Sequence, residues 1–260
     1  MLAVLSDVHA NLEALEAVLA DAAAHGATQY ASLGDVIGFN GDPAACVQRL
    51  LPLVGIAVRG NHEQALMRRG LFGVPLYTRM MDLTGAMLPP ETQAPLRELP
   101  FRAVQDGVTF VHAGPNNPET WPRLGTTASA APAFGAFTGK LCFFGHTHRA
   151  TVFSETEMHI EGAAGSHTWG KVEKLHIPYD ADGSFRLVLE AGKRYLVNPG
   201  SVGQPRDHDP RAAYALYDAA TSTVLLRRVA YDIESACPKI SRTGLPESFA
   251  AALRRGTDPT

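Results

Sequence analysis

The sequence predicts an α/β protein that starts as a parallel, doubly wound sheet and continues into a second, largely antiparallel sheet packed on the first. In the first 70 residues, short apolar runs alternate with segments of helical spacing. After residue 150, the spacing changes to short alternating strands. The chain has 260 residues, a length over which one hydrophobic core can still grow, so we expect a single domain over residues 1–260.

Composition and charge exclude several classes of protein. Hydrophobic residues make up 45% and charged residues 19% of the chain, which is typical of a globular protein and excludes a fibrous or mostly unfolded one. The formal net charge is −3 and the 23 basic residues are scattered, so we expect no binding to duplex nucleic acid. The longest nearly unbroken apolar stretch, Leu50–Val58, is far shorter than the roughly 18 residues of a bilayer span, so we expect no membrane partner.

The N-terminus and the cysteines predict the cellular compartment. No basic residue precedes Arg49, and the first apolar run is too short for a signal peptide, so we expect a cytoplasmic protein. Cys46, Cys142 and Cys237 are widely spaced and form no CxxC pair. We therefore expect three buried apolar side chains rather than disulfides or a thiolate zinc site.

Strands and helices alternate at the start of the chain. Leu2–Leu5 is a short apolar run, and Asn11 then acts as the N-cap of a helical pattern that closes at Gly26. The same unit recurs as strand Tyr30–Leu33, helix Pro43–Leu51, strand Ile56–Val58 and a helix start at His62–Arg69.

The middle of the chain loses this rhythm. Residues 70–100 show no strand spacing, and Pro89, Pro90 and Pro95 punctuate mostly helical material, which predicts a helical insertion covering one end of the sheet. A hairpin follows, with strands Phe101–Val104 and Val108–Val111 joined by Asp106-Gly107. We then expect a helix at Ala128–Phe137 and a strand at Leu141–Phe144.

The remainder of the chain predicts short strands and a helical tail at about residues 233–260. The expected strands are Ala150–Phe153, Met158–Glu161, Lys171–Ile177, Phe185–Leu189, Tyr195–Asn198, Ala213–Tyr217 and Val224–Val229.

Five strands of the first 150 residues each end in a polar cluster. Because ligands bind at the carboxyl ends of the strands in an open α/β sheet, we expect these clusters to form one site. Alone, each Asp would be read as a turn or cap residue and each His as a buried core residue. Their joint placement favours a site instead. The clusters are Ser6-Asp7-Val8-His9, Gly34-Asp35, Arg59-Gly60-Asn61-His62-Glu63, His112-Ala113-Gly114 and Gly145-His146-Thr147-His148.

This site would hold two carboxylates, one asparagine and five histidines, which are metal ligands without a thiolate. Asp7 and His9 stand two residues apart, as do His146 and His148, so on extended segments the side chains of each pair point to the same side. These donors suffice for two metal ions bridged by one carboxylate, about 3.5–4 Å apart.

The motifs Asp7-x-His9, Gly34-Asp35, Gly60-Asn61-His62-Glu63, His112 and Gly145-His146-x-His148 resemble those of the calcineurin-like metallophosphoesterases in type and order. Asn198-Pro199-Gly200-Ser201 is similar to a late motif of the small bacterial phosphodiesterases in that family. The resemblance implies a metallo-dependent phosphatase fold, a four-layer α-β-β-α sandwich of two mixed sheets.

The resemblance also implies the role of each residue. One ion would be held by Asp7, His9 and His148, the other by Asn61, His112 and His146, with Asp35 bridging them and His62 protonating the leaving group. The two divalent ions would make a nucleophile from a bridging water. Mn²⁺, Fe²⁺ and Zn²⁺ all suit such ligands, and we favour Mn²⁺.

One departure from the family narrows the expected substrate. The segment Gly34–Asn40 lacks the Asp-Arg-Gly that supplies a phosphate-binding arginine in protein phosphatases and symmetrical diadenosine tetraphosphatases. We therefore expect a phosphodiesterase acting on small or nucleotide-type diesters. The alternatives are a phosphomonoesterase or nucleoside polyphosphate hydrolase using the same site, and a non-catalytic scaffold.

Two further residues are candidates for binding the substrate phosphate. Arg206, in the loop after Asn198–Ser201, is the first choice and Arg149 is a weaker one. A solvated or ion-paired arginine is the alternative for both. The insertion at residues 70–100 leaves the sheet just after Asn61-His62 and is expected to form a wall of the substrate pocket or to bury the end of the sheet.

Overall fold

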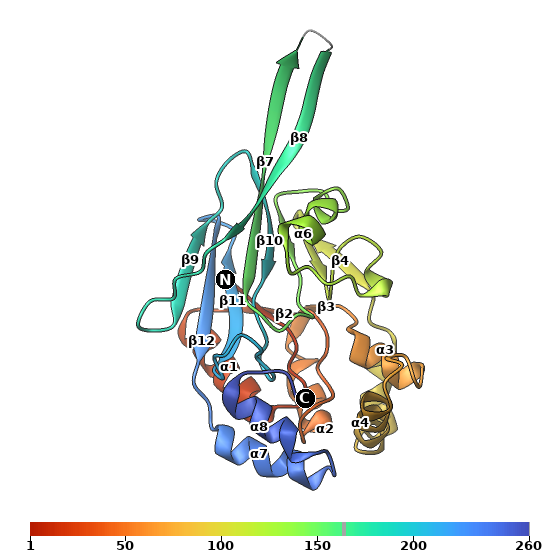
Figure 1. Ribbon diagram of the computed structural model, residues 1–260. Coiled ribbons are helices and arrows are strands. Elements are labelled where there is room, and N and C mark those ends of the chain that lie inside the picture. The colour runs from red at the N-terminus through yellow and green to blue at the C-terminus, as the bar shows by residue number, and fades with distance from the viewer. Residues whose placement is uncertain (163–164, 260) are drawn as a thin grey trace.

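The computed structural model describes residues 1–162 and 165–259, with side chains for residues 1–157 and 170–259. Two six-stranded sheets face each other, and helices cover both outer faces (Figure 1). Three groups of buried side chains separate the four layers. The expected α-β-β-α sandwich of two mixed sheets is therefore confirmed.

The first sheet has the order β3-β2-β1-β11-β12-β9. Its strands are β1 (Leu2–Leu5), β2 (Gln29–Ser32), β3 (Val54–Ala57), β9 (Ser184–Val188), β11 (Ala212–Asp218) and β12 (Thr223–Val229). β1, β2 and β3 run parallel, and the other three continue the sheet antiparallel. Its outer face is covered by α1 (Leu12–Ala24), α2 (Pro43–Leu50), α7 (Ile233–Arg242) and α8 (Glu247–Arg255).

The second sheet has the order β4-β5-β6-β10-β7-β8. Its strands are β4 (Arg102–Gln105), β5 (Val108–Val111), β6 (Leu141–Phe143), β7 (Thr151–Gly162), β8 (Gly165–Leu175) and β10 (Lys193–Asn198). β5, β6 and β10 run parallel. The helix α6 (Thr127–Phe134) packs on its outer face, and its Ala130 and Phe134 belong to the same group of buried side chains as Phe144 and Phe153.

The expected division of strands between the sheets is wrong. The strands after residue 150 do not form a separate antiparallel sheet, because β9, β11 and β12 extend the first sheet and β7, β8 and β10 extend the second. β1 pairs with β2 along one edge, and β6 pairs with β5 along one edge. The other edge of β1 and the other edge of β6 are therefore open to further strands. The later strands satisfy the backbone groups of both edges, which would otherwise remain unpaired.

Two element boundaries also differ from expectation. The two strands expected at Ala150–Phe153 and Met158–Glu161 are one strand, β7, which pairs with β8 in a hairpin that extends beyond the body of the molecule (Figure 1). The side chains of residues 158–169 lie outside the described part. The tail is two helices, because Gly244 adopts a φ of +83° and Pro246 cannot continue α7. Thr260 lies outside the described residues.

The segment from residue 61 to 100 is helical, as expected. It contains α3 (Asn61–Met67), α4 (Pro75–Ala86) and α5 (Pro90–Arg97), and a short 3₁₀ turn (Pro118–Thr120) follows later. Met80 and Met81 of α4 are buried in the same group of side chains as α1 and α2. All three cysteines are buried. Among the described residues, no helix has the length and apolarity needed to span a membrane.

Candidate active site

The predicted site residues come together where the two sheets meet. Asp7, Asp35 and Asn61 follow β1, β2 and β3, while His112 and His146 follow β5 and β6, so all lie at carboxyl ends of parallel strands. Three groups of donor atoms within 4.8 Å of one another form there. They are Asp7, His9 and His148; His9, Asp35 and His62; and Asp35, His112 and His146.

The backbone geometry that produces this convergence differs from the expected extended one. Asp7 and His9 have φ values of 54° and 49°, and His146 and His148 have values of 66° and 57°. These left-handed conformations cost about 1–3 kcal/mol each in a non-glycine residue and persist only where surrounding contacts impose them. Hydrogen bonds of 3.1 Å from Asp7 N to Gly34 O and 2.9 Å from His9 N to Asp35 O provide such contacts.

The first donor group is preorganised for a cation. Nδ1 of His9 donates to Ile37 O at 2.9 Å and Nδ1 of His148 donates to Gln204 O at 2.6 Å, which leaves both Nε2 atoms without a proton and turned inward. Nε2 of His148 lies 3.2 Å from Asp7 Oδ1. That carboxylate oxygen is buried and accepts no hydrogen bond in the described part of the chain, so it fits a positive ion.

The second donor group repeats this arrangement. Nδ1 of His112 donates to Leu33 O at 2.8 Å, and its Nε2 lies 2.9 Å from Asn61 Oδ1. Nδ1 of His146 lies 2.8 Å from the same amide oxygen. Asp35 Oδ2 lies 3.3 Å from Nε2 of His112 and 3.7 Å from Nε2 of His9, so this carboxylate stands between the two groups and could bridge two ions.

The protonation states of these groups suit metal ligation. Burial disfavours the charged imidazole and lowers the pKa of His146 to about 3 and that of His148 to about 4. Burial raises the pKa of the Asp35 carboxyl, but the neighbouring histidines outweigh it and hold this pKa below its usual range. Burial also lowers the pKa of His112, but here the Asp35 charge outweighs burial and raises the pKa to about 9. A cation bound there would therefore displace a proton.

His62 differs from the other histidines in its contacts. Its backbone N–H donates to Asp35 Oδ1 at 2.8 Å, its Nε2 lies 3.8 Å from Asp35 Oδ2, and its Nδ1 has no hydrogen-bond partner among the described residues. Burial lowers the pKa of its imidazole well below the usual value, although Asp35 opposes this. Since a bound phosphate anion would raise that pKa, His62 is placed to hold a proton near a phosphate ester once one is bound.

Glu63, in the Gly-Asn-His-Glu segment, has a structural role that was not predicted from the sequence. Its buried carboxylate accepts three backbone N–H groups: Asp35 N at 2.8 Å, Val36 N at 2.8 Å and Gly60 N at 2.9 Å. Glu63 thereby joins the loops that carry Asp35 and Asn61. A glutamate three residues inside a helix start is the sequence signal of such a bond.

The Asn198–Ser201 segment supports the opposite side of the site. Asn198 Nδ2 donates to Gly145 O at 2.7 Å and to Thr147 Oγ1 at 3.0 Å, which holds the loop of His146 and His148. Ser201 Oγ donates to Asp7 O at 2.8 Å. This segment therefore positions the donors rather than joining them.

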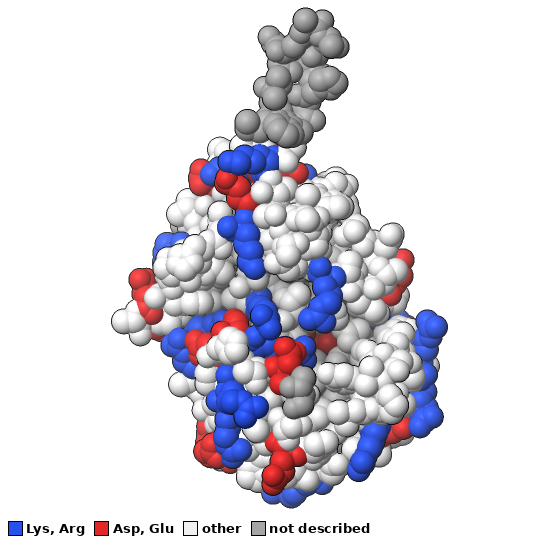
Figure 2. Space-filling model, viewed as in Figure 1, with Lys and Arg blue, Asp and Glu red and all other residues white. Residues whose placement is uncertain are grey.

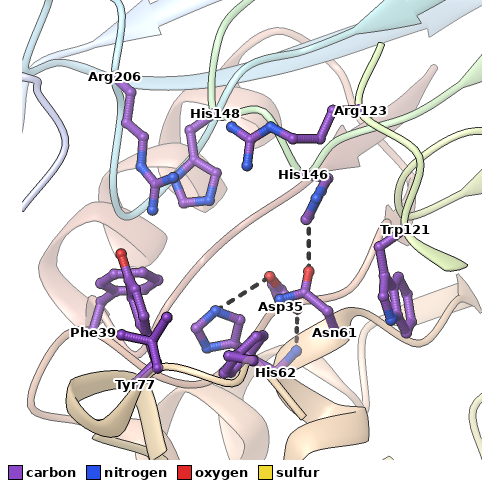
Figure 3. A pocket seen from close by; sticks show the side chains of 12 residues that line it. Asp35, Phe39, Asn61, His62, Tyr77, Trp121, Arg123, His146, His148 and Arg206 are labelled. Carbon is purple, nitrogen blue, oxygen red and sulfur yellow. Dashed lines mark hydrogen bonds and ion pairs between the residues drawn. The ribbon is translucent and has the colours of Figure 1, made fainter.

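A cavity of about 280 Å³ opens over the donors (Figure 3). In this view Arg206 and Arg123 lie beside His148 and His146, and Phe39 and Tyr77 lie below Arg206. Its lining residues are Asp35, Phe39, Asn61, His62, Phe72, Val74, Tyr77, Trp121, Arg123, His146, His148 and Arg206. Phe72, Val74 and Tyr77 belong to the insertion, which therefore forms one wall.

The two candidate arginines have different surroundings. Arg206 is buried in the cavity wall, with its guanidinium 5.2 Å from the centre of the Phe39 ring and an ion pair of 3.1 Å to Asp258. Arg149 lies outside the cavity, half exposed, 3.6 Å from Asp258. Arg123 and the aromatic residues of the cavity were not predicted, because nothing local in the sequence marks them.

Fold and site together define a metal-dependent phosphoesterase. A calcineurin-like phosphoesterase superfamily domain matches residues 1–222, and the chain belongs to this family. The chain is 35% identical to an uncharacterized protein from Methanocaldococcus jannaschii, with 98% of each covered. It is also 35% identical to a metallophosphoesterase from Sphaerobacter thermophilus, with a TM-score of 0.80 and coverage of 98% of this chain and 99% of that one. A hypothetical protein from Pyrococcus horikoshii shares the fold at 20% identity, with a TM-score of 0.69 and coverage of 99% and 100%.

Proposed function

We propose that this phosphoesterase hydrolyses small or nucleotide-type phosphodiesters. The cavity over the donors carries the proposal, because it offers separate surroundings to the two substituents of a diester. Phe72 and Tyr77 give the cavity an apolar wall, and Arg123 and Arg206 give it a cationic one. A monoester would use only one of these walls.

The donors divide the work of the reaction. Asp7, His9 and His148 would hold one divalent ion, and Asn61, His112 and His146 a second, with Asp35 between them. When bound, such ions lower the pKa of water and neutralise charge on the phosphoryl oxygens. We propose Mn²⁺ as the native metal; the imidazole, carboxylate and amide donors fit this ion, and they fit Fe²⁺ and Zn²⁺ as well.

His62 would act on the leaving group. Its imidazole faces the cavity beside Asp35, and it is buried against the ring of Phe72, whose centre is 5.2 Å away. The negative charge of a bound diester raises the pKa of this imidazole and so favours the protonated form that can donate to a leaving oxygen. General acid catalysis of this kind contributes about 10²- to 10⁴-fold to a rate.

The test is turnover of bis(p-nitrophenyl) phosphate against p-nitrophenyl phosphate by protein loaded with Mn²⁺, Zn²⁺ or Fe²⁺. We expect kcat/KM for the diester to exceed that for the monoester by about tenfold or more, equivalent to about 1.4 kcal/mol of transition-state binding. A ratio in favour of the monoester would support the second candidate, a phosphomonoesterase or nucleoside polyphosphate hydrolase. The pair Arg123 and Arg206 favours that candidate, because two cations can neutralise a terminal phosphate.

A further inference from the structure

A second hollow adjoins the catalytic cavity. It is a groove of about 570 Å³ that shares Arg123 with the cavity and contains Thr147, the residue between His146 and His148. Its wall also contains Arg149 and Lys174. The groove therefore borders the loop that carries two of the metal donors, and neither Phe72 nor Tyr77 lines it.

The charge of this groove is positive. Lys174 Nζ donates to Gly125 O at 3.1 Å, a neutral partner that leaves the charge unmatched. Within residues 1–157 and 170–259, neither Lys174 nor Arg123 forms an ion pair, and Arg149 has the loose contact with Asp258 at 3.6 Å. The acidic residue in the groove wall, Asp207, is paired with Arg228.

The cations reach the groove from separate parts of the fold. Arg123 lies in the loop before α6, Arg149 directly follows His148, and Lys174 lies on β8. Figure 2 shows Lys and Arg side chains bordering a hollow on this face of the molecule. Thr126, Ser129 and Thr151 also line this wall, but their hydroxyls donate within the protein, to Ser129 Oγ, Thr126 O and Arg149 O, so the cations are the groove's free donors.

We propose that this groove binds a second anionic group of the substrate, so that the preferred substrates are phosphate esters that carry a further phosphate. This inference rests on the proposed function for the position of the scissile phosphate. The chemistry of the groove is that of a phosphate subsite, because exposed guanidinium and ammonium groups converge there without an uncompensated carboxylate.

Two nucleotides that differ by one phosphate test the proposal by binding. Mn²⁺-loaded protein is titrated calorimetrically with thymidine 5′-monophosphate and with thymidine 3′,5′-bisphosphate. We expect the bisphosphate to bind about tenfold more tightly, the combined effect of two exposed charge pairs. This advantage should decrease as NaCl is added, because the groove is open to solvent.

Variants assign the effect to the groove. The double substitution Arg149→Gln and Lys174→Met should reduce the bisphosphate advantage to within about twofold. The single substitution Lys174→Met should lower the advantage in part, and its matched control is Lys171→Met, which removes one positive charge from the same strand, from a lysine paired with Glu173 at 2.6 Å and outside the groove. Equal Kd values for the two nucleotides in the wild type, or an equal loss of the advantage in the control, would overturn the proposal.

Turnover separates this proposal from the proposed function. Thymidine 5′-(p-nitrophenyl phosphate) is compared with the same diester bearing a 3′-phosphate. Hydrolysis of both at equal kcat/KM would refute the groove proposal and leave the diesterase assignment standing. Tenfold tighter binding of the bisphosphate without hydrolysis of either diester would support the groove and refute the diesterase.

Discussion

Replacing Glu63 with glutamine tests how the site is held together. The buried carboxylate of Glu63 accepts backbone N–H groups from Asp35, Val36 and Gly60 at 2.8–2.9 Å. Glutamine has the same shape but offers one accepting oxygen, so its NH₂ group must face at least one of these donors. The unfolding free energy of the metal-free protein should fall.

The size of this effect follows from two opposing contributions. A buried N–H without an acceptor costs about 1–3 kcal/mol, and a bond to a charged group contributes about 1.5–3 kcal/mol. In the opposite direction, burial and the nearby Asp35 charge raise the pKa of Glu63, which means that its charged form is costly to bury. The neutral glutamine removes part of that cost. We therefore expect a net loss of about 2 kcal/mol. Because Asp35 is displaced, metal affinity should fall about 10- to 100-fold.

Urea unfolding of the metal-free protein and titration with Mn²⁺ measure the two effects separately. Glu247→Gln is the matched control, since Glu247 is also in the first turn of a helix but is exposed. If Glu63→Gln unfolds within about 0.5 kcal/mol of this control, the range typical of surface substitutions, and binds Mn²⁺ normally, Glu63 does not hold the two loops.

Three further predictions concern the donors, the proton and the pH dependence of stability. Asp35→Asn should abolish turnover and lower metal content measured by atomic absorption, because the negative charge of the bridging carboxylate is lost; full activity with two bound metals would contradict the bridging role. His62→Asn should lower the rate about 10²- to 10⁴-fold while both metals stay bound, with a smaller loss for leaving groups that need no proton; metal loss as large as in His146→Ala would make His62 a ligand. Burial alone raises the pKa of Asp21, but hydrogen bonds from Arg227 and Tyr214 lower it below its ordinary 3.8. The ionised Asp21 therefore stabilises the fold above pH 3.8, and this stabilisation is lost as the pH falls through the lowered pKa. In urea unfolding, Asp21→Asn should cost about 1 kcal/mol of unfolding free energy at pH 7 and clearly less at pH 3. An equal cost at the two pH values would refute this.

Much of the architecture was determined by local features of the sequence. Apolar spacing locates the first strands and helices, because the periods of 2 and 3.6 are properties of the backbone itself. The donors Asp7, Asp35 and His112 were predictable for a related reason. Each lies within three residues of the end of a strand, and parallel strands bring their carboxyl ends to one edge whatever the rest of the chain does.

Tertiary structure decided which strands close each sheet and what surrounds the donors. β11 pairs with β1 across more than 200 residues of chain, and no local signal distinguishes that edge from the edge of β6. The ion pair of Arg206 with Asp258 and the placement of Tyr77 over the cavity likewise depend on separate segments meeting. Spacing along the chain encodes which face of an element a residue occupies, but the partner of that face depends on how all the elements pack together.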